Sequence, residues 1–397
     1  MRIYLTALNP TDSLLDGFLP AAAGLGLPVT VLTDQPTGWP SVTAEVAGCD
    51  VRDPRAVIDT IHNGQAPAAL LSNSDHLQTP TALAAAYLGL PGKDWRATLR
   101  CKDKRLTRRT LADAGLDAVA TATIGPTDGV EAAATLPFPA VVKPREGVAS
   151  EDAYLVADLA ELTERVAGIR ARRPGTPLVV EEYLAGELRT FDTLGDGTTL
   201  TVTGSWHTTL GRPPSFIEES LDWAPALPER AVADLRAQLD ALGVGFGACH
   251  TEFVLAGDRA RLIEVNYRLI GDRMDLILAE LLGIPLFEYV LRVHLGEPLA
   301  GMPRPEPAAV SRHARVEYVC ADTPGTLVAA PGNVDLRVDD TWVGCRPLRR
   351  LGVTVPVTGT NRDYLAVLHA IGADPAAVRS ALRQFRDGHR WTIGTPA

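Results

Sequence analysis

Residues 250–268 carry the side chains whose types and spacing are best suited to chemistry. Two apolar runs, 253–255 and 262–265, flank the turn residues Gly257 and Asp258, and this pattern predicts a β-hairpin. The polar side chains of the segment then lie on two paired strands, so their facing can be derived from strand geometry.

Glu252, Glu264 and Asn266 are expected on one face of this hairpin. Side chains alternate between faces along a strand, so Glu264 and Asn266 point the same way. A pairing of Ala256 with Ala260 places Glu252 opposite Glu264. A tighter two-residue turn would shift the register by one and carry Glu264 to the other face. We expect the longer turn.

The facing carboxylates indicate a metal site. Two carboxylates opposite each other on a sheet repel, and a cation between them removes the repulsion. Carboxylate and amide oxygens suit Mg²⁺ better than zinc. Arg268 follows Asn266 by two residues, shares its face and can hold an anion beside the metal. The alternative is a solvated polar face without a metal, which a hairpin taken alone favours.

Lysine is scarce in a chain whose basic residues are nearly all arginine; the lysines are Lys93, Lys102, Lys104 and Lys143. Those that remain are candidates for tasks that need a compact ammonium, such as phosphate contact. Lys104 lies in an expected amphipathic helix over 101–114. Lys143 ends an expected strand before a turn with Gly147 and Ser150, whose N–H groups and hydroxyl can bind phosphate.

A further apolar run over 178–184 predicts a strand that carries Glu181 and Glu182. An exposed strand end can bind the edge of an adenine through its backbone. A ribose needs a carboxylate acceptor, and Glu187 in the following turn is the candidate. Each of these residues taken alone is typical of an ordinary surface charge. The functional interpretation therefore depends on the whole set of residues in this order along the chain.

In this order the motifs resemble the ATP-grasp superfamily, in its carboxylate–amine ligase branch, and are similar to the L-amino acid ligases. Glu252-Phe253 with Glu264, Asn266 and Arg268 resembles the metal hairpin of the family. Asp103-Lys104 and Val142-Lys143-Pro144 resemble its two nucleotide lysines. Glu181, Glu182, Tyr183 and Leu184 resemble the hinge that receives adenine. The phosphate loop departs from the family in having one glycine, and Asn266-Tyr267-Arg268 replaces the common N-P-R.

The resemblance implies an α/β (α+β) ATP-grasp fold in three units. Residues 1–100 would form an N-terminal parallel-sheet βα domain, residues 101–300 the ATP-grasp domain, and residues 301–397 a small C-terminal α+β subdomain. The proline-rich stretch 302–307 fits the second boundary.

The resemblance also implies an ADP-forming ligase that joins a carboxylate, of an amino acid or similar molecule, to an amine through an acyl phosphate. ATP and two Mg²⁺ ions would be bound, and Arg268 would steady the transferring phosphoryl group or the later oxyanion. Glu218 stands in a segment similar to the amine-binding segment of dipeptide ligases, although Leu221 replaces a frequent histidine. Arg273 is a candidate for a substrate carboxylate. Peptide-like metabolite or siderophore synthesis would be a suitable setting.

Two alternatives remain at this point. A biotin-carboxylase-like or nucleotide-biosynthesis enzyme shares the hairpin, but no biotinyl M-K-M segment is present. A nucleotide-binding module without turnover would need neither both carboxylates nor Arg268.

Composition argues against nucleic-acid and membrane partners, and the resemblance implies small-molecule substrates. The net charge of −10 argues against a general nucleic-acid binder. No apolar run approaches the roughly 20 residues of a membrane helix, and the N-terminal segment lacks a secretory pattern, so we expect a cytoplasmic protein. The five cysteines are dispersed and form neither a zinc motif nor a disulfide framework. A homodimer is left open.

Overall fold

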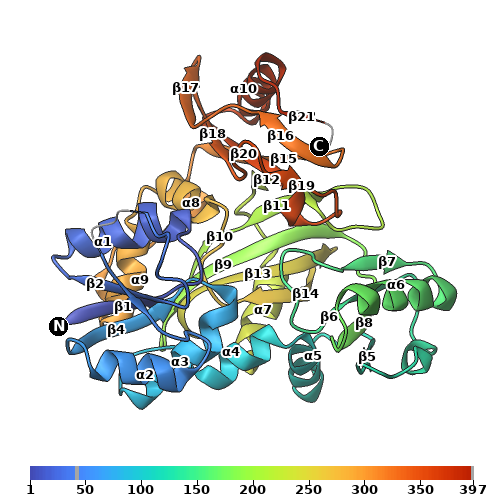
Figure 1. Cartoon of the computed structure of the whole chain (residues 1–397), viewed down its shortest axis with the longest axis horizontal. Coiled ribbons are helices and arrows are strands. Elements are labelled where there is room, and N and C mark those ends of the chain that lie inside the picture. Colours follow the sequence, from blue (N-terminus) through green and yellow to red (C-terminus); the bar gives the residue numbers. More distant parts are fainter. Residues whose placement is uncertain (41–43, 395–397) are drawn as a thin grey trace.

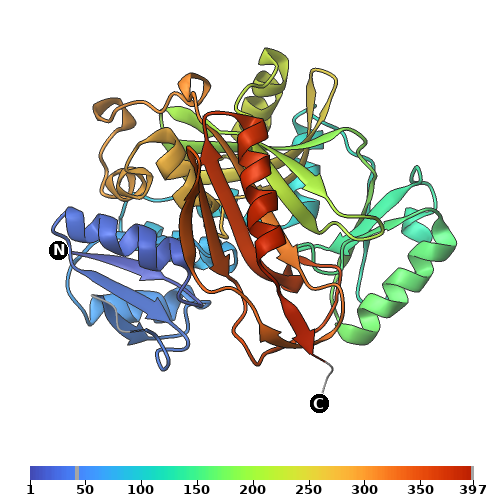
Figure 2. The same ribbon diagram turned by 90° about the horizontal axis from the view of Figure 1, so that it is seen from above.

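The N-terminal residues form a parallel sheet of four strands. A computed structural model describes residues 1–40 and 44–394 of the chain (Figures 1 and 2). The strand order is β3-β2-β1-β4, with bounds β1 (Arg2–Thr6), β2 (Val29–Thr33), β3 (Glu45–Gly48) and β4 (Pro67–Ser72). The helical segments of this unit are η1 (Ser13–Phe18), α1 (Leu19–Gly24), α2 (Pro54–His62), α3 (Gln78–Tyr87) and α4 (Trp95–Lys102). Parallel pairing requires such crossover helices, and the predicted βα unit is confirmed.

A second, smaller sheet lies on the opposite side of the molecule, drawn in green in Figure 1. Its four strands pair antiparallel in the order β5-β8-β6-β7. The bounds are β5 (Thr121–Ile124), β6 (Ala140–Pro144), β7 (Tyr154–Val156) and β8 (Leu178–Glu182), with helix α6 (Leu159–Arg172). Asp158 caps α6 by accepting from Glu161 N at 2.9 Å. We call this unit, residues 119–184, the lid.

A ten-stranded sheet joins the centre of the chain to its C-terminal part. From residues 187–266 and 313–372 come β9 (Glu187–Asp196), β10 (Leu200–Gly204), β11 (Trp206–Leu210), β12 (Glu218–Trp223), β13 (Phe246–Ala256), β14 (Arg259–Asn266), β15 (His313–Cys320), β17 (Val334–Val338), β18 (Thr341–Pro347) and β20 (Tyr364–Gly372). Because β12 pairs with β15, the C-terminal residues extend this sheet. A three-stranded sheet of β16 (Gly325–Ala329), β19 (Thr354–Val355) and β21 (Thr392–Gly394) completes that part. The predicted division at residues 100 and 300 stays a prediction.

The remaining helices cover the sheets. They are α5 (Lys104–Asp113), α7 (Glu229–Leu242), α8 (Met274–Leu282), α9 (Leu286–His294) and α10 (Pro375–Gly388). Gly243 and Gly283 end α7 and α8 in the left-handed conformation that glycine adopts readily. Within the described residues, no helix combines the length and apolarity needed to cross a bilayer.

The helix expected over 101–114 is divided in the structure, which corrects that prediction. Asp103 is extended, with φ −90° and ψ 104°, and its carboxylate accepts from Arg105 N at 3.0 Å and Leu106 N at 3.3 Å. An N-cap of this kind starts a new helix. Lys104 is therefore the first residue of α5 and sits at a helix terminus rather than on a helix face.

Helix α9 ties the N-terminal sheet to the central sheet. It contacts η1, α1, β4, β9 and β13, and the rings of Phe18 and Phe287 meet edge to face with centroids 5.0 Å apart. A Cβ added to Gly17 would lie 2.3 Å from the Phe287 ring. Glycine at 17 is thus required by the close approach of η1 and α9.

Gly17→Ala should lower the free energy of unfolding by about 1–3 kcal/mol, because the added methyl group overpacks this junction. The matched control is Gly24→Ala, where the added Cβ meets no heavy atom within 4 Å. That control should leave stability unchanged or raise it by up to about 1 kcal/mol. Urea unfolding measures both, and equal midpoints for the two variants would contradict the packing described.

Candidate active site

The hairpin of β13 and β14 places Glu252 directly opposite Glu264, as the sequence predicts. Asn266 pairs with His250 two positions further along, so it lies on the same face as Glu264. All three side chains line one large cavity between the units of the fold.

The turn of this hairpin differs from the prediction. Ala256 pairs with Arg259, so the connection is the two-residue turn and the longer turn was wrong. A β-bulge corrects the register further along. Phe253 pairs with Leu262 whereas the next residue, Glu252, pairs with Glu264, which leaves Ile263 as the extra residue. The bulge therefore brings the two carboxylates to one face.

The facing carboxylates are electrostatically strained. Burial, followed by the nearby Glu264 carboxylate, raises the pKa of Glu252. Asn266 donates its Nδ2 to Glu252 Oε1 at 3.1 Å, which leaves its amide oxygen as an acceptor for another group. Lys104 Nζ lies 3.3 Å from Glu264 Oε2 and donates to Gly147 O at 3.0 Å. A further cation between Glu252 and Glu264 would relieve the repulsion.

The donor set fits Mg²⁺ when phosphate oxygens complete it. No cluster of three or more His, Cys, Asp and Glu side chains suited to a metal occurs within residues 1–40 and 44–394. Two carboxylates with one amide oxygen are an incomplete cage for a six-coordinate ion. Mg²⁺ sites of nucleotide enzymes have this composition, with one or two carboxylates and the substrate phosphates.

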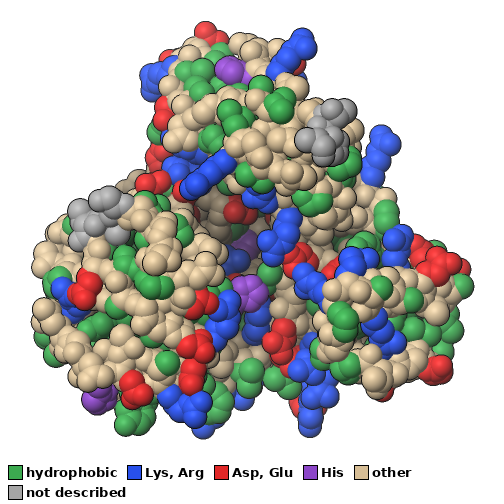
Figure 3. Space-filling view, in the orientation of Figure 1, with side chains coloured by type: hydrophobic (Ala, Val, Ile, Leu, Met, Phe, Trp, Pro, Cys, Tyr) green, Lys and Arg blue, Asp and Glu red, His purple; other side chains and the backbone are tan. Residues whose placement is uncertain are grey.

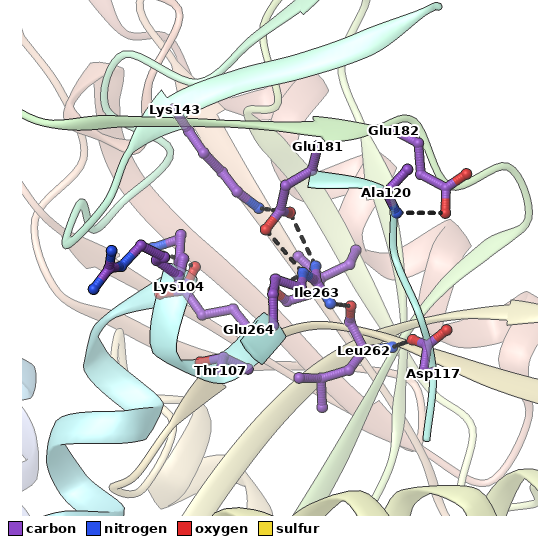
Figure 4. A network of polar contacts seen from close by, with 12 residues as sticks. Lys104, Thr107, Asp117, Ala120, Lys143, Glu181, Glu182, Leu262, Ile263 and Glu264 are labelled. Atoms are coloured by element: carbon purple, nitrogen blue, oxygen red, sulfur yellow. Dashed lines mark hydrogen bonds and ion pairs between the residues drawn. The ribbon is translucent and has the colours of Figure 1, made fainter. Parts of the chain in front are cut away.

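A buried guanidinium joins the hairpin to the lid, near the point where Lys143 and Glu181 face each other (Figure 4). Arg108 binds both oxygens of Glu181, at 2.8 and 2.9 Å, and donates to Leu262 O at 2.6 Å and Ile263 O at 3.4 Å. It thus satisfies the carbonyls at the bulge. Lys143 Nζ lies 2.8 Å from Glu181 Oε2. The sequence prediction missed Arg108, although it follows Lys104 by four residues, a spacing that places the two side chains on the same side of α5.

Glu181 orients Lys143 through this network. Burial would raise the pKa of Glu181, but Arg108 and Lys143 hold it well below its usual range. Burial also lowers the pKa of Lys143, and Glu181 opposes that shift. Val141 pairs with Glu181 across β6 and β8, so Lys143 reaches Glu181 diagonally on one face of the lid sheet.

The predicted hinge lies at the cavity wall, where Glu182, Tyr183 and Leu184 line it. The Glu182 carboxylate accepts from Arg261 Nη2 at 2.8 Å and from Ala120 N at 3.3 Å, which fixes the strand end. Tyr183 N–H is bound by a carbonyl of the lid at 3.0 Å. Within the described residues, no backbone carbonyl engages Leu184 N–H, so this group is available to a base edge.

Glu187 is not brought to the cavity, and its predicted ribose contact is corrected. Gly186 and Leu188 line the cavity, whereas Glu187 alternates to the other side of β9. Its side chain is 62% exposed and lies 3.7 Å from Arg189. Ser150 does line the cavity, in the loop between β6 and β7, as predicted.

The predicted substrate residues have different surroundings. Burial, followed by the Glu252 carboxylate, raises the pKa of Glu218 to about 8. Arg273 lines the cavity, but its Nη1 is 3.1 Å from Asp12 Oδ2 and 3.0 Å from Asp16 Oδ2. The positive charge of Arg273 is therefore already balanced by these two carboxylates of the N-terminal unit. Arg268 donates to Leu269 O at 2.7 Å and lines the cavity near the carboxylates.

The cavity has a volume of about 730 Å³, and the hollow with its charged rim is visible in Figure 3. One end holds the lysines, the hinge and the metal hairpin. The other end adds apolar side chains from the C-terminal part, from β12 and from the loop before β12, namely Phe216, Leu221, Tyr318, Leu348 and Tyr364. A cavity of this volume accommodates a ligand considerably larger than a single amino acid.

A buried dyad of Asp192 and His250 also belongs to this site and was missed. His250 Nδ1 lies 2.6 Å from Asp192 Oδ1, and its Nε2 lies 3.9 Å from Glu252 Oε1. Burial lowers the pKa of His250, but Asp192 outweighs it and the net shift is upward. The sequence offered a signal, since His250 precedes Glu252 by two residues and must share its face. Asp192, 58 residues away, gave none.

Similar proteins agree with this architecture. No protein-family model matches the chain. The uncharacterized protein y4rH of Sinorhizobium fredii (strain NBRC 101917 / NGR234) is 26% identical over 417 residues, which cover 99% of this chain and 84% of the relative. The L-amino acid ligase from Bacillus licheniformis has a TM-score of 0.83 at 21% identity, with 99% of each chain covered. The biotin carboxylase of Campylobacter jejuni, solved as a beta-gamma-ATP complex, has a TM-score of 0.70 at 14% identity, covering 99% of this chain and 92% of that one.

The chain therefore has the ATP-grasp fold over 99% of its length. This confirms the predicted fold class. At these identities the similarity establishes the architecture, and the reaction must be argued from the site.

Glu218→Gln should raise the thermal midpoint at pH 9 by a few degrees and give no gain at pH 4. Because the pKa of Glu218 is raised in the folded state, the ionised carboxylate destabilises the fold above about pH 8. This loss of stability vanishes at a pH below the pKa of glutamate in the unfolded chain, near 4.3. Calorimetry at the two pH values measures it.

Glu219→Gln, next to it and exposed, is the control and should change the midpoint little at either pH. An equal gain at pH 4 and pH 9 for Glu218→Gln would contradict the shifted carboxyl group.

Proposed function

We propose that this chain, whose fold is that of the ATP-grasp ligases, is an ADP-forming ligase that joins the carboxylate of an amino acid to an amine. The observation that carries the proposal is the opposed pair Glu252 and Glu264, with Asn266 beside it. Lys104 and Lys143 stand in the same cavity. This combination of two carboxylates and two ammonium groups suits transfer of a phosphoryl group.

The nucleotide would lie between the lid and the hairpin. Leu184 N–H offers a donor for the adenine edge, and Lys143 and Lys104 offer positive charge further along the cavity. The similarity to a biotin carboxylase solved with a nucleotide supports this placement. The turn with Gly147 and Ser150 would cover the phosphates, as loops with exposed N–H groups do.

Glu252, Glu264 and Asn266 would hold the metal, and we propose two Mg²⁺ ions. When bound, Mg²⁺ neutralises the charge that phosphoryl transfer spreads over the phosphate oxygens. Lys104 contacts Glu264, and its ammonium group would turn toward the phosphates when Mg²⁺ is bound.

The reaction would have two balanced steps. A carboxylate oxygen attacks the γ-phosphorus of ATP, and the bond between that phosphorus and the β-phosphate oxygen breaks. ADP departs and an acyl phosphate is formed. An amine nitrogen then attacks the acyl carbon, phosphate departs, the amine loses a proton, and an amide forms. Arg268, beside the carboxylates, would stabilise the transferring phosphoryl group or the oxyanion of the second step.

The far end of the cavity supports an amino acid as substrate. Glu218 and Asp272 line this end, and burial raises the pKa of both carboxyl groups. An ammonium group bound beside them would favour their ionised forms. The apolar wall that includes Phe216 and Tyr318 suits an apolar side chain. Arg349 lines the same end, and its guanidinium can balance a carboxylate. Because Arg273 is paired with Asp12 and Asp16, it is the weaker candidate.

The first experiment is phosphate release from ATP and Mg²⁺ in the presence of amino-acid pools. Release that requires two amino acids and yields ADP supports the proposal. Release that requires bicarbonate would favour a carboxylase, and nucleotide binding without release in any mixture would favour a module without turnover.

Glu264→Gln should lower the rate of phosphate release by at least 100-fold while the thermal midpoint is kept, because the amide cannot supply the second negative ligand. Asp258→Asn makes the same chemical change at the exposed turn of the same hairpin and is the control. A Glu264→Gln variant with the activity of Asp258→Asn would remove the hairpin from the mechanism.

A further inference from the structure

The loop that faces the phosphate end of the cavity is held from outside the lid. This phosphate loop, residues 145–153, joins β6 to β7, and its middle residues line the cavity. Two of its three acids are nearly buried, with Glu151 9% and Asp152 6% exposed, whereas Glu146 is exposed. Acids at a loop tip are normally solvated, so their burial shows that the loop is packed against partners.

The partners of these two acids are arginines from two different units. Asp152 pairs with Arg172 at 2.5 Å and with Arg173 at 3.1 Å, both at the end of α6 within the lid. Glu151 pairs with Arg173 through Oε2 and with Arg362 through Oε1. Arg362 belongs to the C-terminal part, so Glu151 bridges the lid and that part.

Two backbone hydrogen bonds reinforce the bridge. Asn361 N donates to Ala149 O at 3.2 Å, and Leu155 N, at the start of β7, donates to Pro214 O at 2.9 Å. The turn that presents Asn361 is itself fixed, because Asp363 accepts from Thr358 N at 2.9 Å. A rigid turn therefore meets the loop at its tip.

The loop conformation is one that needs such support. Ala149, Ser150 and Asp152 have φ values of 55°, 56° and 55°, in the left-handed region that residues with a Cβ rarely adopt. Strained backbone of this kind persists where surrounding contacts determine it. The outside contacts at Ala149 and Glu151 flank the strained residues directly.

We propose that Arg362 is a positioning residue that latches the phosphate loop over the nucleotide, so that the C-terminal part decides whether the lid is closed. This rests on the proposed function in that the covered ligand is ATP and the protected product is an acyl phosphate. Such an intermediate is lost to water when the loop opens, and lid closure excludes water. The latch couples substrate at the C-terminal end of the cavity to closure at the phosphate end.

The test compares Arg362→Ala, Arg362→Lys and Arg383→Ala in the full chain. Arg362 is 63% exposed, so its removal leaves the fold intact. Arg383 is exposed on α10, makes no ion pair with the residues described, and serves as the matched control. Hydrogen exchange of residues 145–155 without nucleotide should rise at least threefold in Arg362→Ala and less in Arg362→Lys. It should be unchanged in Arg383→Ala.

The second readout is functional. Arg362→Ala should raise the KM for ATP about tenfold and increase the phosphate released per amide formed at least threefold, and Arg362→Lys should restore most of both. Equal loop exchange in Arg362→Ala and the unaltered chain would overturn the latch, and so would faster exchange with unchanged KM and coupling. Faster loop exchange in a chain that releases no phosphate with any substrate would instead overturn the proposed function, because the exchange readout does not depend on turnover.

Discussion

The site depends on two carboxylates that a bulged hairpin forces to face each other. Two like charges that face each other on a sheet repel. Burial and this repulsion together raise the pKa of Glu252. The bulge at Ile263 would also leave backbone carbonyls without ladder partners, and Arg108 binds them. The same guanidinium holds Glu181, which orients Lys143. One buried cation thus fixes both the facing carboxylates of the hairpin and Lys143, across two units of the fold.

The strand and helix patterns could be predicted because they are local. Alternation placed Glu264 with Asn266, and the apolar runs 253–255 and 262–265 lie in β13 and β14 as predicted. Glu252 and Glu264 were correctly predicted to face each other, although the predicted turn was wrong. The two-residue turn shifts the strand pairing by one residue, and the bulge shifts it back. No pattern in the hairpin sequence distinguishes this combination of a short turn and a bulge from the longer turn.

Other parts of the site depend on contacts between distant segments. Asp192 meets His250 only because β9 and β13 pair, and Arg108 meets Glu181 across 73 residues. The prediction for Glu187 was wrong for a different reason. The side of β9 on which its side chain lies depends on where the strand begins, which is one residue past Gly186. A shift of one residue there would have turned it into the cavity.

The C-terminal part is integral to the site, because it continues the central sheet through β15 and adds Tyr318, Arg349 and Tyr364 to the cavity. It also reaches the phosphate loop through Asn361 and Arg362. The two ends of the cavity are therefore connected by rigid elements. That arrangement suits a reaction in which a reactive intermediate must wait for its second substrate in the absence of water.

The most direct test of the central claim is an electron paramagnetic resonance titration of Mn²⁺, a probe for Mg²⁺, with and without a non-hydrolysable ATP analogue. If Glu252, Glu264 and the nucleotide phosphates form one metal site, Mn²⁺ should bind tightly only when the analogue is present. Glu252→Gln should then weaken that binding at least tenfold. Equal Mn²⁺ binding by the unaltered chain and by Glu252→Gln, in the presence of the analogue, would contradict the account.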